Sequence, residues 1–353
     1  MRFRSGWSVT ATIKDVARAA GVSVASVSRA LNGHESVTDA TRQRIVAAAG
    51  QLRYVPHAAA RSLITRRTDT IGVLLPDLHG EFFSELIRGI DAGARAIGRH
   101  LLISSSHGSE AEATQALRVL QGRVDGMLVM SPHAGSDVLA ANLPATLPTV
   151  LLNTRVAAGS YPAFSVDNYG GAAAMMQHLF ASGRQRIAFI SGPDNNFDAD
   201  ERLSGYRDAI AQRSGASEIV LRGDFSESSG YRAGIEICAG NDRPDAIFAA
   251  NDMMALGCLF ALTEQGVAVP DEIALAGFDD IPIARFVTPP LTTVRVRIAD
   301  LGRRAFDRLA ELIANGDDGA KTIERLDCDL VVRQSSGARG AAASTHASTA
   351  DTS

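Results

Sequence analysis

The sequence predicts a small all-α head at the N-terminus, built around a helix-turn-helix, and a larger α/β domain made of two similar lobes. Helical periodicity around a tight turn fills residues 12–55, and a short segment, residues 56–68, follows. From Asp69 onwards, strands alternate with helices in two runs, which are separated by a break near residues 153–167. Such alternation predicts parallel sheets that are covered by helices on both faces.

The charge is divided between the same two parts. Residues 1–67 contain 11 Lys and Arg against 3 Asp and Glu, a net charge of +8, whereas the whole chain carries −4, so the remainder carries −12. A compact basic segment joined to an acidic body is typical of a DNA-reading domain. A basic, solvated arm would give the same charge, so the charge alone leaves both interpretations open.

Composition argues against several other classes of protein. The longest apolar runs, such as residues 71–75 and 149–152, fall far short of the roughly 18 residues of a membrane helix. Cys238, Cys258 and Cys328 are scattered and fit neither a disulfide framework nor a zinc site, so we expect reduced thiols, no metal and no cofactor. Residues 1–11 form a leader without the apolar core of a secretory signal, and we expect a cytoplasmic, nucleoid-associated protein.

The first helix of the head has clear end signals. The hydroxyl of Thr12 can accept backbone N–H groups of the first turn, and Asp15 stands where the partner of a capping box would be. Gly21 tolerates a positive φ and is expected to end the helix. One face of the helix is apolar, with Ile13, Val16, Ala17 and Ala20.

Two more helices complete the head. Ser23 is expected to cap the second helix, which turns Val27 and Leu31 inward. Its outer face carries Val24, Ala25, Ser28 and Arg29. The third helix begins near Thr38 and is expected to bury Ile45, Ala49 and Leu52. The first two helices, joined by Ala-Ala-Gly-Val-Ser, form a helix-turn-helix whose second helix can enter a major groove.

The larger domain is expected to span residues 69–334. Strands are predicted at residues 71–75, 101–104, Gly126–Met130, Ile187–Ile190, 219–222, Ala246–Ala249 and 273–276. Helices are predicted at residues 82–97, 111–120, 169–182, 201–213, 228–239 and 252–265. Residues 335–353 are rich in Ala, Ser, Thr and Gly and are expected to form a disordered tail.

Polar residues follow several of these strands. They are Asp77 after the first strand, Arg202 after the fourth, Asn251 and Asp252 after the sixth, and Asp279 and Asp280 after the seventh. Ligands of open α/β sheets bind at the carboxyl ends of the strands. Taken singly, Asp279 could cap a helix and Arg202 could form a structural ion pair. Their coincidence at strand ends favours a small-molecule site.

Residues 12–32 read T-I-K-D-V-A-R-A-A-G-V-S-V-A-S-V-S-R-A-L-N. This segment resembles the lactose-repressor (LacI) family of bacterial regulators, and the resemblance continues to about Gln334. It implies a body with the two-lobed periplasmic-binding-protein-like fold, in which the chain crosses between the lobes near residues 165, 292 and 323. It also implies a homodimer that binds a pseudo-palindromic operator.

The resemblance gives roles to residues of the head. Val24 and Ala25 match positions that read bases by apolar contact, and Arg29 matches a position where a guanidinium fork suits guanine. Side chains suited to phosphates are Ser23, Ser26, Ser28, Asn32, Thr38 and Thr41.

Residues 56–65 resemble the hinge helix of the family, through the A-R-S-L core of residues 60–63. Leu63 would wedge into the minor groove beside Ala60, at a central CG step of the operator. The alternative is that Leu63 packs on the body. His57, in the first turn of this segment, departs from the Asn or Ser of many relatives. Because a helix of about ten residues is marginal alone, this one is expected to form only on DNA and in pairs.

In the body, Arg202, Asn251 and Asp279 match the residues that hold effector hydroxyls in sugar-responsive members of the family. Asp198 and Asp77 lie beside them. Phe82, Phe83 and Phe225 match aromatic wall positions, although one of Phe82 and Phe83 is expected in the core. Matching motifs point to the galactose-repressor branch and to a sugar effector. The same framework serves other sugars and purines, so a nucleobase corepressor remains the alternative.

Two other classes of protein fit less well. The chain has no Walker, dinucleotide-binding, zinc-peptidase or serine-hydrolase motif, and the adjacent Ser106 and His107 show no sign of a triad, which argues against an enzyme. A ligand-binding protein without a DNA role leaves the basic head unexplained. The sequence therefore predicts a non-enzymatic repressor of carbohydrate uptake or catabolism genes.

Overall fold

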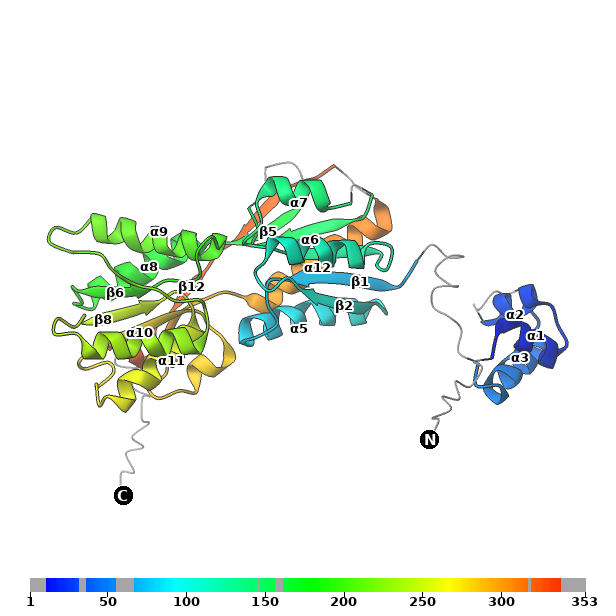
Figure 1. Cartoon of the computed structure of the whole chain (residues 1–353), viewed down its shortest axis with the longest axis horizontal. Helices are drawn as coiled ribbons and strands as arrows, with labels where there is room; N and C mark the ends of the chain where they lie inside the picture. Colours follow the sequence, from blue (N-terminus) through cyan, green and yellow to red (C-terminus); the bar gives the residue numbers. More distant parts are fainter. Residues whose placement is uncertain are drawn as a thin grey trace, which may run out of the picture. The chain divides into compact units, whose positions relative to one another are not determined.

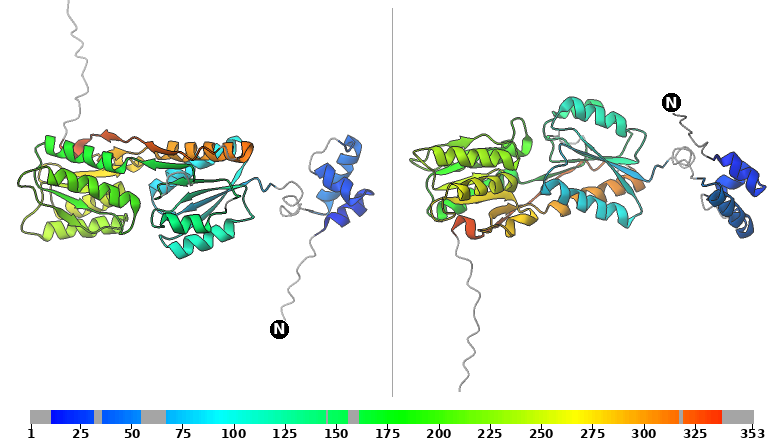
Figure 2. Two further views of the ribbon diagram at one scale, coloured as in Figure 1. Left: turned by 90° about the horizontal axis from the view of Figure 1, so that it is seen from above. Right: turned by 60° about the horizontal axis from the view of Figure 1, so that its bottom comes forward.

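The computed structural model describes residues 11–31, 36–54, 67–144, 146–155, 161–316 and 319–337. The chain divides into two compact units, Met1–Thr68 and Asp69–Ser353, which are considered separately (Figures 1 and 2). Asn32, Ala60 and Leu63, for which we predict DNA contacts, lie outside the described residues, and so do the leader up to Thr10 and residues 338–353.

The described part of the first unit consists of α1 (Ile13–Ala20), α2 (Val24–Leu31) and α3 (Asp39–Gln51). Thr12 begins α1 in a complete capping box, since its backbone N–H donates to Asp15 Oδ2 over 3.0 Å and its hydroxyl accepts the N–H of Asp15. Val16, Val27 and Ile45 are each 0% exposed and form the centre of a small core. The predicted helix-turn-helix is therefore confirmed as a packed unit.

The expected burial of Leu52 is wrong. Leu52 follows α3 as its C-cap residue and is 37% exposed. Because α3 ends at Gln51 and Arg53 adopts a φ of 49°, the chain turns away from the helical path directly after Leu52, and the apolar stripe ends before it. Ala48 is buried on that stripe instead, and Tyr54 packs against the core.

Lobe one of the second unit is a six-stranded sheet in the order β11-β5-β4-β3-β1-β2, with every pair of neighbours parallel (Figure 1). Its strands are β1 (Thr70–Leu75), β2 (His100–Ser105), β3 (Gly126–Met130), β4 (Thr149–Leu152), β5 (Ala163–Val166) and β11 (Ile323–Leu326). Its helices are α5 (Glu81–Ala96), α6 (Glu110–Leu120), α7 (Ser136–Asn142) and α12 (Ile298–Asn315).

Lobe two is a second six-stranded sheet in the order β12-β10-β9-β8-β6-β7, in which β12 runs antiparallel to β10. Its strands are β6 (Ile187–Ile190), β7 (Ile219–Leu221), β8 (Ala246–Ala249), β9 (Ala274–Asp279), β10 (Thr292–Arg295) and β12 (Asp329–Val331). Its helices are α8 (Asn168–Ala181), α9 (Phe197–Ala211), α10 (Glu227–Ala239) and α11 (Asp252–Glu264). In its core, Phe189 stacks on Tyr206 and meets Phe248 edge to face.

The chain passes between the lobes three times. It leaves lobe one after β5, returns after β10 to form α12 and β11, and leaves again for β12. The expected crossing points near residues 165, 292 and 323 fall within β5, β10 and β11, so each crossing follows the end of its strand.

The predicted disorder from residue 335 is wrong for residues 335–337. Gln334–Ser336 form a short 3-10 helix, in which Ser335 and Ser336 are 0% exposed. Ser335 Oγ donates to Leu275 O over 2.6 Å and accepts the N–H of Thr292 over 2.8 Å. Serine-rich composition indicates a loop, but here the hydroxyls satisfy backbone groups of β9 and β10, which orders the segment.

Gly89 allows α5 and α12 to approach closely. A Cβ at Gly89 would lie 1.9 Å from the backbone oxygen of Ala299, which cannot rotate away. We expect Gly89→Ala to lower the free energy of unfolding by at least about 1–3 kcal/mol, measured by urea denaturation. Ala92→Ser, on the exposed side of α5, is the control and should change it by less than about 0.5 kcal/mol. An unchanged midpoint for Gly89→Ala would contradict the close packing.

Candidate functional site

The outer face of α2 carries the residues that we expect to read bases. Val24 is 41% exposed, and Ala25 and Arg29 are also exposed. Arg29 Nε donates to Ala25 O over 3.4 Å, a contact within the helix itself. This face therefore offers an apolar patch next to a guanidinium, which suits a thymine methyl beside a guanine.

Hydroxyl groups gather at the start of two helices of the head. Ser23 Oγ accepts the N–H of Ser26 over 3.1 Å and lies 2.9 Å from Ser26 Oγ, which caps α2. Thr38 Oγ1 donates to Thr41 Oγ1 over 3.0 Å. Ser28, within α2, is half-buried. Helix N-termini with hydroxyl groups are suited to phosphate contacts.

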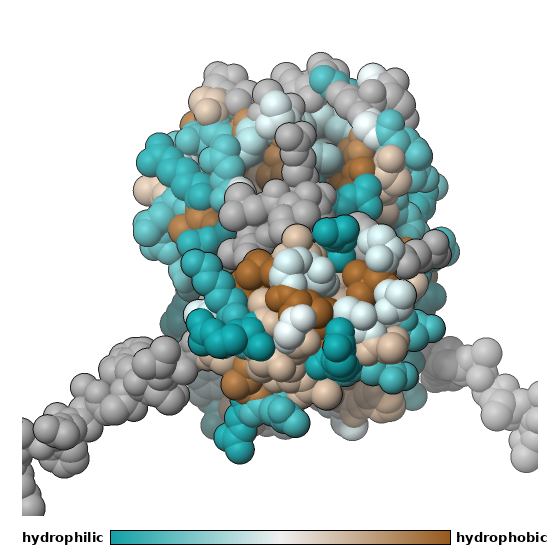
Figure 3. Space-filling model, turned by 90° about the vertical axis from the view of Figure 1, so that its right-hand side faces the viewer, coloured by the Kyte–Doolittle hydropathy of each residue, from teal (hydrophilic) through white to brown (hydrophobic). Residues whose placement is uncertain are grey.

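Hydrophobic and hydrophilic side chains are interspersed on the face that Figure 3 presents. Among the described residues, no helix is long and apolar enough to cross a membrane.

A cavity of about 130 Å³ lies between the two lobes. All eight residues that we predict to hold the effector line it: Asp77, Phe82 and Phe83 from lobe one, and Asp198, Arg202, Phe225, Asn251 and Asp279 from lobe two. Most of them follow the carboxyl ends of strands, where a doubly wound sheet offers its ligand site. The structure thus brings into one space residues that are up to about 200 positions apart in the sequence.

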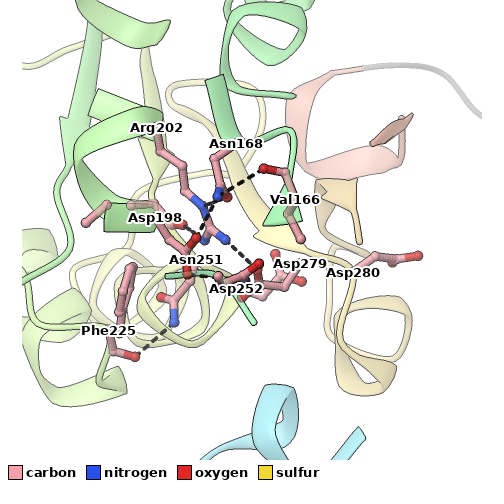
Figure 4. A network of polar contacts seen from close by, with 12 residues as sticks. Val166, Asn168, Asp198, Arg202, Phe225, Asn251, Asp252, Asp279 and Asp280 are labelled. Carbon is pink, nitrogen blue, oxygen red and sulfur yellow. Dashed lines mark hydrogen bonds and ion pairs between the residues drawn. The ribbon is translucent and has the colours of Figure 1, made fainter. Parts of the chain in front are cut away.

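Arg202 lies on the polar side of the cavity, with its side chain 4% exposed (Figure 4). Because α9 begins at Phe197, before the expected start at residue 201, Arg202 stands within the helix. Its Nε donates to Asn168 Oδ1 over 2.8 Å, and its Nη1 donates to Ala250 O over 2.5 Å. Its Nη2 lies 3.2 Å from Asp279 Oδ1, and the ring of Phe278 lies 3.8 Å from Cζ.

Asp198 joins the two lobes. Asn153, directly after β4 in lobe one, donates to Asp198 Oδ2 over 3.3 Å, and Asn168 at the start of α8 donates to Oδ1 over 2.7 Å. Burial raises the pKa of Asp198 to about 6, against the opposing effect of Arg202. Asn153 and Asn168 were not among the residues predicted from the sequence, although Asn153 directly follows β4 and Asn168 begins α8 just after β5.

Asp279 ends β9 with a φ of 112°, and Asp280 follows with a φ of 54°. Such conformations are strained for residues other than glycine and persist only where the surroundings hold them. Asp280 accepts hydrogen bonds from Arg295 Nε over 2.7 Å and from Arg333 Nη2 over 2.5 Å, which fixes the turn. Burial raises the pKa of Asp279 to about 7, although the charge of Arg202 lowers it.

The side chains of Asn251 and Asp252 also hold neighbouring segments in place through hydrogen bonds. Asn251 Oδ1 accepts the N–H of Met254 over 2.9 Å, and its Nδ2 donates to Phe225 O over 3.0 Å (Figure 4). The amide therefore caps α11 while it lines the cavity. Asp252 is fully buried, accepts hydrogen bonds from Thr293 Oγ1 and the N–H of Ile281, and is not among the lining residues.

Aromatic rings form the apolar side of the cavity. Phe82 and Phe83 meet edge to face, with ring centroids 5.4 Å apart. Both are half-buried, both pack against the hydrophobic core and both line the cavity, so the two rings do not divide into one core residue and one wall residue. The first turn of α5 presents both rings. Phe225, at a φ of 70°, places its ring 5.8 Å from Arg202 Cζ.

Direct contacts between the lobes surround the cavity. The N–H of Phe197 donates to Pro132 O over 3.2 Å, and Arg155 Nη2 donates to Asp200 Oδ2 over 2.6 Å. On another side, the N–H of Ile283 donates to Glu81 Oε2 over 3.1 Å. A ligand in the cavity would therefore lie between two surfaces that already touch.

Comparison with known proteins assigns both units. Residues 12–57 match the family described as bacterial regulatory proteins, lacI family, and residues 176–336 match a periplasmic binding protein-like domain. The ribose operon repressor of Escherichia coli (strain K12) is 37% identical over 309 residues, which cover 86% of this chain and 93% of that protein. The HTH-type transcriptional repressor PurR of Photobacterium profundum is 33% identical over 329 residues, which cover 92% and 98%.

A solved structure gives the same assignment. The lac repressor dimer, crystallised with operator and the anti-inducer ONPF, matches with a TM-score of 0.78 and 29% identity, over 92% of this chain and 99% of that chain. Together with the helix-turn-helix and the two lobes, these matches show the family. The chain belongs to the lacI family of bacterial regulatory proteins.

Proposed function

We propose that this protein is a transcriptional repressor that binds operator DNA through α2, and that a small ligand between the lobes sets its operator affinity. The observation that carries the proposal is the inter-lobe cavity, because all eight residues inferred from the sequence line it. An exposed helix-turn-helix on the same chain supplies the DNA-binding part. If the ligand binds one arrangement of the two lobes more tightly than another, ligand binding and DNA binding would be coupled.

The proposed assembly on DNA is a homodimer on a pseudo-palindromic operator. The lac repressor structure, a dimer on operator, supports this by analogy. Two heads would then meet two half-sites. The wedge of Leu63 beside Ala60 at a central CG step stays a prediction.

The proposed effector is a small sugar, and the proposed targets are carbohydrate uptake or catabolism genes. The similarity to a ribose operon repressor supports this choice, although the resemblance to the galactose-repressor branch stays a prediction. A nucleobase corepressor is the second candidate. The three phenylalanine rings of the cavity favour it, since a flat base can stack on them.

We further propose that the protein has no catalytic activity and acts on the nucleoid in the cytoplasm. Ser106 is buried and its hydroxyl donates to Leu75 O over 3.4 Å. His107 faces Glu112 at 4.0 Å on the surface. Neither contact activates a nucleophile.

Arg29→Ala tests the base-reading role. We expect operator binding to weaken by about 1–3 kcal/mol and the preference at one guanine to relax, measured by fluorescence anisotropy on duplexes that differ at that base pair. Arg95→Ala, on the exposed surface of α5, removes the same charge and should leave the operator Kd unchanged. Equal weakening on every duplex would reassign Arg29 to a phosphate contact.

Asp279→Asn tests the cavity. We expect this variant to bind operator as the parent does but to lose the change in operator Kd that the effector causes. The amide keeps only one acceptor oxygen and loses the negative charge that strengthens hydrogen bonds from ligand hydroxyls. Operator titrations with and without D-ribose, D-galactose and hypoxanthine measure it. Asp91→Asn, on the exposed side of α5, is the control. Full ligand sensitivity in Asp279→Asn would count against the site.

Effector affinity should rise with pH. Burial raises the pKa of Asp198 to about 6 and that of Asp279 to about 7, so both carboxyls are largely protonated below these values. Ligand hydroxyls bind ionised oxygens more strongly, so binding should lower both pKa values and release protons. Calorimetry between about pH 5.5 and 8 should show affinity increasing and then levelling off. Constant or falling affinity would oppose this role.

A further inference from the structure

We propose that the cavity selects an uncharged ligand rich in hydroxyl donors and rejects phosphorylated or carboxylated derivatives of the same compound. This inference rests on the proposed function and specifies the ligand class of the same cavity. It depends on which charges line the cavity and on which of their atoms already have partners.

Acidic groups dominate the charge of the cavity wall. The described lining residues include four carboxylates, Asp77, Asp198, Asp224 and Asp279, and one guanidinium, that of Arg202. His79 also lines the cavity and lies 3.5 Å from Glu227. A ligand therefore enters a space in which negative charge exceeds positive charge.

The guanidinium group of Arg202 already contacts groups of the protein. All three of its guanidinium nitrogens contact protein oxygens, those of Asn168, Ala250 and Asp279. The ring of Phe278 covers one face of the group. Recognition of a phosphate or carboxylate uses the paired N–H groups of a free arginine fork. Here Nε and Nη1 are hydrogen-bonded to Asn168 and Ala250, and Nη2 is ion-paired with Asp279, so an anion would have to displace Asp279 or Ala250.

Oxygen acceptors, by contrast, have unused capacity. Asp279 lines the cavity, and its Oδ1, which is buried, faces Arg202 Nη2 at 3.2 Å without a hydrogen bond of good geometry from the described residues. The two oxygens of Asp198 each accept one amide hydrogen bond, although each can accept two. A ligand must therefore bring O–H or N–H donors, and several hydroxyls on neighbouring carbons supply them. An anion brings acceptors and a like charge instead.

Two rim carboxylates are fixed at the cavity by their own loops. Asp77 Oδ1 accepts the N–H groups of Leu78 and His79 over 2.6 and 3.1 Å. Asp224 Oδ1 accepts the N–H of Ser226 over 2.9 Å, and its other oxygen lies 3.6 Å from the exposed Arg232. Since neither carboxylate is free to swing away, both would repel an entering anion.

The test compares matched ligands on the full-length protein. Calorimetry measures D-ribose against D-ribose 5-phosphate, D-galactose against D-galacturonate, and D-glucose against D-glucose 6-phosphate, with hypoxanthine as a fourth probe. We expect at least one uncharged sugar to bind and its anionic partner to bind at least about 100-fold more weakly. Operator titrations of the same samples report whether each bound ligand changes the DNA affinity.

A double variant separates charge from size. Asp77→Asn/Asp224→Asn keeps an oxygen acceptor for each loop N–H but removes two negative charges. We expect it to reduce the ratio of the anion's Kd to the sugar's Kd, here called the affinity gap, by about tenfold. Asp91→Asn/Glu311→Gln removes two exposed charges outside the cavity lining and should leave the gap unchanged. An unchanged gap in the first variant would overturn the electrostatic cause, since steric exclusion would not respond.

Three results would overturn the proposed ligand class without contradicting the proposed function as a DNA-binding regulator. They are an anion that binds as tightly as its uncharged partner, binding of hypoxanthine alone, and binding of no uncharged sugar. The proposed function fails by a different result, namely the absence of duplex binding in every state of the protein, or a bound ligand that leaves operator affinity unchanged.

Discussion

The guanidinium of Arg202 organises lobe two. A buried charge is costly unless it is paired and fully hydrogen-bonded, so its partners must stand in fixed places. Those partners come from three separate elements: Asn168 starts α8, Ala250 follows β8, and Asp279 ends β9. The same group therefore aligns the ends of the elements that form the cavity. Asn168 also bonds Asp198, which in turn bonds Asn153, and so extends the network into lobe one.

Much of the fold could be predicted because its physical causes are local. Gly126–Met130, Ile187–Ile190 and Ala246–Ala249 have the same bounds in sequence and structure, since strands buried on both faces are continuous apolar runs. Leu52 and Ser335 could not be placed in this way. Leu52 depends on where α3 ends, and Ser335 on a backbone oxygen 60 positions away in β9. Tertiary contacts decide both, and no local pattern carries that information.

The sequence could predict many of the residues that form the site, but not the hydrogen bonds that their atoms make. The rule that ligands meet the carboxyl ends of parallel strands, together with the family resemblance, identified eight of the lining residues, but not Asp224 or His79. Residue type alone could not show that the amide of Asn251 caps a helix, or that one oxygen of Asp279 is left without a hydrogen bond. Nor could it show that Asn153 and Asn168 hold Asp198. Such assignments depend on ångström distances between segments far apart in sequence.

The three crossings have a consequence for how the chain is made. Lobe one begins at Thr70 but lacks α12 and β11 until synthesis reaches Leu326, and lobe two lacks β12 until Val331. Until then, the surface of α5 that α12 covers, which includes Leu86 and Ile90, stays open to other chains. The core of the head, as far as the described residues form it, lies before residue 55. A growing chain on the ribosome thus carries a finished DNA-binding unit ahead of an unfinished sensor, and only the last tenth of the sequence completes the latter.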